Sequence, residues 1–262
     1  ANVDSNERFK KIHEDIKGRM WFAMENSFSL FSDDNWELYQ FNPVVFTGDV
    51  CSLKNGLLVV GATDKGGLAL FNPTDKSKTV TFPFGNEKIR YFDQDKNGNC
   101  FIILQDLNDT SRLIRYDGEH TENLAEDLKI NDLAPGECEV TDIIETRSGD
   151  IWIVTFTDII VYKNGVRKSF DLKEEFDWGL STSILELGNG NIWIGGNKGI
   201  LQYNGEEWSQ VQTPEFETTR KMIIARDSSI WVASGTGIHK LINGTWISNS
   251  SEEGLPDAVI FD

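Results

Sequence analysis

Residues 93–99 (DQDKNGN) hold residue types that can bind a metal ion. Oxygen-bearing side chains alternate there and glycine is sixth, as in a calcium-binding loop. The twelfth position of such a loop is a glutamate that binds through both oxygens, but here it is Leu104. The histidines, His13, His120 and His239, have none of the HxH or HExxH spacings that hold zinc. We therefore predict no metal or cofactor, with a divalent cation as the alternative.

Catalysis by a nucleophile or by paired acids needs side chains that a motif brings together. No motif of that kind surrounds the three histidines, which lie far apart in the sequence. Among 42 Asp and Glu residues some pair is always close in space, but no spacing in the sequence identifies a catalytic pair. We predict no catalytic residue, and an enzyme that uses carboxylates is the alternative.

The three cysteines, Cys51, Cys100 and Cys138, are widely spaced and odd in number. Such a set is not a disulfide framework, and no CxxC pair indicates zinc or redox chemistry. Because Cys51 and Cys100 lie in apolar segments typical of strands, we expect buried free thiols. One bridged pair is the alternative in an oxidising compartment.

An internal repeat indicates which elements position these residues. Similar segments begin at Ser148, Gly190 and Ser228 and share a turn, an Ile-Trp pair, a loop and a second apolar run. A Trp is followed ten residues later by an apolar residue and fifteen later by a second Trp, as in Trp193, Tyr203 and Trp208. The copies are anchored at Trp21, Leu58, Phe101, Trp152, Trp193 and Trp231. Their period of about 40 residues, with alternating apolar residues, is typical of a propeller blade.

Each copy predicts four strands. In the fifth copy we expect strands at 182–187, 191–195 and 199–203 and a fourth beginning near Trp208. Asn-Gly pairs predict tight hairpins, because both residues tolerate positive φ: Asn97-Gly98, Asn164-Gly165, Asn204-Gly205 and Asn243-Gly244. Residues 119–138 read as an insertion, and the composition of 121–129 favours a short helix.

The repeat resembles a known family. Asn189-Gly190-Asn191-Ile192-Trp193-Ile194-Gly195 and the segment 14–22 (EDIKGRMWF) are similar to the two-component regulator propeller repeat, and the resemblance covers about residues 9–260. It implies a bacterial, sensor-type β-propeller in the periplasm or outside the cell, with the cytoplasm as the alternative. The repeat also resembles, more loosely, the streptogramin lyases, which use His, Glu and magnesium.

The predicted fold is all-β, a six-bladed β-propeller of four-stranded antiparallel blades that forms one domain over residues 1–262. A seven-bladed ring or a piece of a longer array is the alternative, because residues 257–262 read as a further first strand.

We expect the repeated Trp residues to pack between blades and the binding site to lie on one loop face. The loops on that face join the second strand of a blade to its third, and the fourth strand to the first strand of the next blade. Trp178 stands outside the repeated register and is a stacking platform or a cap on a neighbouring blade. The candidate ligand-binding residues on this face are Trp178, Asp158, Lys198, Arg220, Glu25 and Lys65.

The charge of the chain narrows the possible partners. With 25 Lys and Arg against 42 Asp and Glu, the net charge is −17, which repels nucleic acids and anionic membranes. No apolar run is long enough for a membrane helix, and residues 1–11 do not predict a secretory signal. The sequence favours non-catalytic recognition of a small molecule, glycan or protein by a sensor-type or scaffold propeller. A carbohydrate-active or lyase-type enzyme is the alternative.

Overall fold

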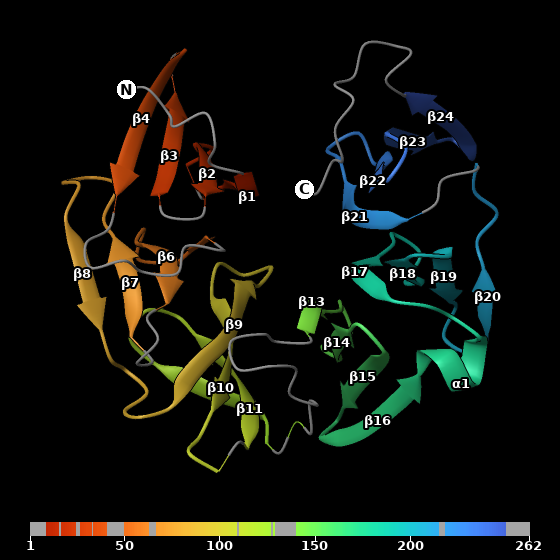
Figure 1. Ribbon diagram of the computed structural model, residues 1–262, viewed down its shortest axis with the longest axis horizontal. Helices are drawn as coiled ribbons and strands as arrows, with labels where there is room; N and C mark the ends of the chain where they lie inside the picture. The colour runs from red at the N-terminus through yellow and green to blue at the C-terminus, as the bar shows by residue number, and fades with distance from the viewer. Residues whose placement is uncertain are drawn as a thin grey trace. The chain divides into compact units, whose positions relative to one another are not determined.

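The computed structural model consists almost entirely of β-strands. It describes residues 9–15, 17–24, 27–32, 34–40, 50–62, 67–108, 110–126, 128, 140–214 and 218–249. Within these residues the strands form six four-stranded sheets, and in each sheet the strands pair antiparallel in chain order (Figure 1). The fold is therefore the predicted six-bladed β-propeller. The predicted further strand at 257–262 lies outside the described residues.

The chain divides into two compact units, and the first, Ala1–Cys138, holds three blades. Its strands are β1 (Phe9–Glu14), β2 (Met20–Met24), β3 (Ser27–Ser32) and β4 (Asn35–Gln40), then β5 (Cys51–Ser52), β6 (Leu58–Ala62), β7 (Leu68–Phe71) and β8 (Lys78–Thr81), then β9 (Lys88–Gln94), β10 (Cys100–Gln105), β11 (Ser111–Tyr116) and β12 (Thr121–Ala125).

The second unit, Glu139–Asp262, holds the other three blades. Its strands are β13 (Val140–Glu145), β14 (Ile151–Thr155), β15 (Asp158–Lys163) and β16 (Val166–Asp171), then β17 (Ser181–Glu186), β18 (Ile192–Gly196), β19 (Gly199–Tyr203) and β20 (Trp208–Gln210), then β21 (Thr219–Ile224), β22 (Ile230–Ser234), β23 (Ile238–Ile242) and β24 (Thr245–Asn249). A short helix, α1 (Leu172–Phe176), joins β16 to β17. No helix among the described residues is long and apolar enough to cross a membrane.

The sequence intervals of the repeat correspond to strand pairing. The residues ten and fifteen positions after the anchor face each other across the third and fourth strands, as in Phe31↔Trp36 and Tyr203↔Trp208. Of the Asn-Gly pairs, Asn164-Gly165 and Asn243-Gly244 have positive φ at both residues, as a two-residue hairpin requires. In the other two predicted hairpins only Gly98 and Gly205 have positive φ.

The anchor side chains pack against the following blade. Trp21 lies among Leu58 and Phe71 of the second blade, and Trp193 lies among Met222 and Val232 of the sixth. Trp152 packs on Tyr203 and Trp208 of the fifth blade. The prediction that these Trp residues belong to the core is confirmed. Trp231, in the last copy, is only half-buried and carries the Lys240 ammonium over its ring.

A β-bulge recurs in the first strand of five blades. The register shifts by one residue between Phe9 and Lys11, and again at the same place in β9, β13, β17 and β21. A bulge redirects the side chains that precede it and increases the local twist. The sequence pattern of alternating apolar residues did not predict this shift.

The predicted helix at 121–129 is wrong, because Thr121–Ala125 forms β12 and completes the third blade. The predicted insertion at 119–138 is corrected for the same reason, since its first part is a strand of the repeat. Helix-favouring composition is a weak preference, and pairing with the open edge of β11 outweighs it.

The expectation of free thiols at Cys51 and Cys100 is also wrong. The two residues are fully buried and form a disulfide, with Cα atoms 6.5 Å apart, between the second and third blades. Cys138 lies outside the described residues.

Replacing Trp21 by alanine should lower the free energy of unfolding by about 3–5 kcal/mol, because it leaves a large cavity between two blades. Replacing Trp36, which is 44% exposed in the same blade, should cost about 1 kcal/mol. Urea unfolding of both variants measures the difference. Equal losses would contradict the assignment of Trp21 to the core.

Removing the disulfide with the double variant Cys51→Ala/Cys100→Ala should lower the free energy of unfolding by up to about 4 kcal/mol, since the bridge closes a long loop of the unfolded chain. Thiol titration of the denatured, unreduced protein should find Cys138 alone reactive. Cys138→Ala is the control for stability. Titration of all three thiols would show that the bridge is absent.

Candidate functional site

A polar cavity of about 500 Å³ lies in the first unit, at the turns of its second and third blades. This volume is within the range of small-molecule sites. The lining residues all have polar or charged side chains: Lys54, Asn97, Asn99, Arg115, Asp117, His120, Thr121 and Glu122. They come from the β5–β6 turn, the β9–β10 turn, the end of β11 and the start of β12. The cavity is therefore on the edge opposite to the predicted loop face.

The Asp95 carboxylate organises the turn below this cavity. Its Oδ1 accepts hydrogen bonds from the backbone N–H groups of Asn97 and Asn99, at 2.7 and 2.8 Å. Its Oδ2 accepts from the Asn99 amide at 2.6 Å and from Arg115 Nε at 3.0 Å. Asp15 makes the same turn in the first blade, with Trp21 Nε1 donating to its carboxylate at 2.8 Å. The segment that resembled a calcium loop is thus the repeated turn of this fold.

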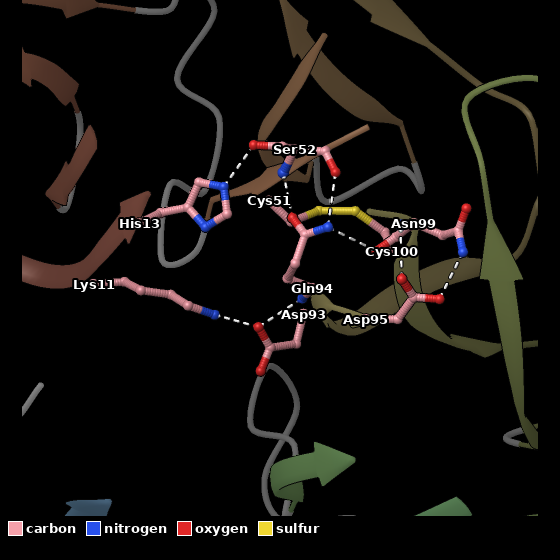
Figure 2. Close-up of a disulfide and its surroundings, with 9 residues drawn as sticks. All are labelled: Lys11, His13, Cys51, Ser52, Asp93, Gln94, Asp95, Asn99 and Cys100. Carbon is pink, nitrogen blue, oxygen red and sulfur yellow. Dashed lines mark hydrogen bonds and ion pairs between the residues drawn. A yellow bond between two sulfur atoms is a disulfide. The ribbon is translucent and has the colours of Figure 1, made fainter. Parts of the chain in front are cut away.

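Asn99 has a hydrogen-bonding group without a partner. The residue is 3% exposed, and its Nδ2 donates to Asp95, which fixes the orientation of the amide. The Oδ1 atom is buried and accepts no hydrogen bond from the residues that the structure describes. Figure 2 shows this oxygen pointing away from Asp95. An unpaired buried acceptor costs free energy, so a donor supplied from the cavity would be stabilising.

The charged groups of the lining are mostly paired. Arg115 bridges Asp95 and Glu122 and lies over the Phe101 ring. Backbone N–H groups of His120 and Glu119 donate to Asp117 and lower the pKa of its carboxyl. The exposed Lys54 ammonium makes no hydrogen bond or ion pair with another described residue. Lys54 therefore carries a positive charge that a ligand can use.

A second polar network lies next to the cavity, on the first strands of the three blades (Figure 2). The Gln94 amide accepts from the Ser52 N–H at 2.5 Å and donates to the Ser52 carbonyl at 2.9 Å, beside the disulfide. Lys11 forms an ion pair with Asp93, which also accepts from the Gln94 N–H at 2.7 Å. This network links the first, second and third blades.

His13 and Ser52 meet in this network, with Nε2 and Oγ 2.6 Å apart. Both residues are buried, at 9% and 2% exposed. Burial, with the nearby Lys11 charge, lowers the pKa of His13 to about 4. Such an imidazole is a weak base, and the buried Ser52 hydroxyl offers little access to a substrate. The pair therefore acts as a buried hydrogen bond between two blades.

The structure places the predicted site residues in different surroundings. Trp178 is only 5% exposed and packs in the core of the fourth and fifth blades, over Gly196, where a Cβ would lie 2.9 Å from its Nε1. It is a cap on a neighbouring blade, and the prediction of an open stacking platform is corrected. Lys198 forms an ion pair with the neighbouring Asp177 at 3.1 Å.

The other candidates on the predicted loop face are described in part. Asp158 begins β15 and accepts a hydrogen bond from Thr157 Oγ1 at 2.7 Å. Arg220 is half-buried at the bulge of β21. Glu25 and Lys65 lie outside the described residues. A ligand-binding role for these residues stays a prediction.

Sequence reasoning missed the cavity because its residues belong to turns that are distant in the sequence. The signal in the sequence is the cluster of polar residues at 95–99, which also resembles a calcium-binding loop. Among the described residues no group of three or more His, Cys, Asp or Glu side chains is placed to hold a metal ion.

No protein-family model and no curated protein matches this sequence. Among solved structures, the extracellular domain of a hybrid two-component system protein from B. thetaiotaomicron is similar, with a TM-score of 0.72 and 19% identity, over 96% of this chain and 35% of that one. This chain therefore spans about a third of its length. The similarity agrees with the resemblance of the repeat at the level of the fold.

Two further similar structures have other activities. A catalytically inactive virginiamycin B lyase from Staphylococcus aureus with quinupristin has a TM-score of 0.70 at 13% identity, over 98% of this chain and 88% of that one. Ycf48 bound to a D1 peptide has a TM-score of 0.64 at 14% identity, over 91% of this chain and 79% of that one. At these identities the similarity shows the β-propeller fold alone.

The pKa of His13 predicts acid destabilisation. The unfolded chain takes up a proton near pH 6.5, whereas folded His13 stays neutral to about pH 4. The free energy of unfolding should therefore fall by up to about 3 kcal/mol as the pH is lowered through this range.

Urea unfolding at several pH values measures this effect. The variant His13→Gln should show a shallower loss of stability than the wild type between pH 6.5 and 4, and the exposed His120→Gln should follow the wild type. Identical slopes for His13→Gln and the wild type would rule out the buried neutral histidine.

Proposed function

We propose that this chain is a non-catalytic, sensor-type recognition propeller that binds a small polar molecule in the cavity of its first unit. The observation that carries the proposal is the buried Asn99 Oδ1, unpaired among the described residues, on a residue that lines a cavity of polar and charged side chains. The similarity in fold to an extracellular sensor domain supports a sensor role.

The ionisation of the cavity acids supports binding rather than catalysis. A general acid needs a raised pKa so that it keeps its proton at neutral pH. Hydrogen bonds lower the pKa of Asp117, so its carboxylate is a charged acceptor that can fix the orientation of a ligand. Glu122 forms an ion pair with Arg115 in the same lining.

We also propose an extracytoplasmic location. The buried Cys51–Cys100 disulfide supports it, because such bridges persist in oxidising compartments. Binding outside the cytoplasm suits a domain that reports a ligand to the cell.

The test is thermal unfolding of the full chain against a panel of amino acids, peptides, sugars and organic acids, followed by mass spectrometry of the mixture. A bound compound should raise the midpoint, because it binds only the folded state. It should be recovered unchanged after long incubation. Conversion to a product at a rate proportional to protein concentration would overturn the non-catalytic proposal and favour the enzyme alternative.

A further inference from the structure

Two residues that line the cavity, Lys54 and Asn99, each have a binding group without a partner among the described residues. Lys54 Cγ lies 3.7 Å from where a Cβ would stand on Gly98, so the Lys54 side chain runs next to the backbone that leads into Asn99. Neither the ammonium of Lys54 nor Asn99 Oδ1 has a partner among the described residues. The site therefore offers one cation and one buried hydrogen-bond acceptor on residues that line the same cavity.

These two groups require opposite features in a ligand. Lys54 matches an anionic oxygen, and Asn99 Oδ1 matches an N–H or O–H donor. A dianion such as phosphate fits poorly, because Asp117 and Glu122 also line the cavity and the chain carries a net charge of −17. A single carboxylate with a donor on the adjacent carbon satisfies both groups and adds little repulsion.

We propose that the cavity binds an α-amino carboxylate group, with the carboxylate on Lys54 and the adjacent N–H on Asn99 Oδ1. This inference rests on the proposed recognition function and names its ligand class. The group is present both in free amino acids and at the C-terminus of a peptide. Asp117 and Glu122 favour the free amino acid further, because its ammonium is positively charged.

Isothermal titration with matched ligands tests the proposal. The probes are the common amino acids, their N-acetyl derivatives, which mimic a peptide C-terminus, and their C-terminal amides, which lack the carboxylate. We expect at least one amino acid or N-acetyl amino acid to bind, and its amide to bind at least about tenfold more weakly. Tighter binding of the N-acetyl form would identify a peptide terminus as the source.

Variants locate the site. Asn99→Ala and Lys54→Gln should each weaken binding about tenfold. Asn191→Ala is the control for Asn99, because it follows Gly190 in the same turn of the fifth blade. Lys17→Gln is the control for Lys54, since Lys17 is exposed in the corresponding turn of the first blade. If Asn99→Ala does not fold, the surface variant Lys54→Gln still decides the outcome.

The outcomes separate this inference from the proposed function. Binding of a sugar or another class, with no binding of amino acids or their N-acetyl forms, would overturn the ligand class and leave the recognition function standing. Amino acid binding that Asn99→Ala and Lys54→Gln leave unchanged would overturn the site. Turnover of the bound compound would overturn the proposed function, whatever the ligand.

Discussion

The packing of one blade against the next depends on a large apolar side chain near the start of the second strand. A sheet must bury its apolar surface against another element, and here the neighbouring blade provides that element. Trp21, Trp152 and Trp193 each fill the space to the following blade, with aromatic residues of the outer strands around them. This requirement fixes the period of the repeat and the register of each hairpin, and it leaves the turns free to vary.

The first strands carry a second constraint, because they bring charged groups into a buried environment. In each unit an ion pair links the first strands of its first and third blades: Lys11 with Asp93, and Lys221 with Asp142. In the second unit the intervening strand also contributes, since the Ile184 N–H donates to Asp142 at 3.0 Å. A buried charge without such a partner would be strongly destabilising, so these strands are held together as well as packed.

The fold can be predicted from the sequence because the intervals between the repeated residues correspond to the pairing of the third and fourth strands. In the fifth blade the predicted strands agree with β17, β18 and β19 to within a residue or two. The sequence does not predict features that depend on how neighbouring blades pack. The bridge between Cys51 and Cys100 depends on how two blades approach each other, and the burial of Trp178 depends on the missing side chain at Gly196. Residues 121–125 form a strand because β11 has an open edge, which composition does not reveal.

The cavity is formed by turns and strand ends, which take little part in the packing between blades. Lys54, Asn97, Thr121 and Glu122 are exposed residues of turns and strand ends, so their side chains bear little of the packing. Asn99 differs, because its backbone N–H and amide nitrogen complete the Asp95 turn on which the register of β9 and β10 depends. The turn thereby holds one carbonyl oxygen in a fixed, buried position, and no donor from the described part of the chain reaches it. Because the fold already fixes this acceptor, little conformational entropy is lost when a ligand binds to it. This edge of the blade is therefore better suited to recognition than a mobile loop.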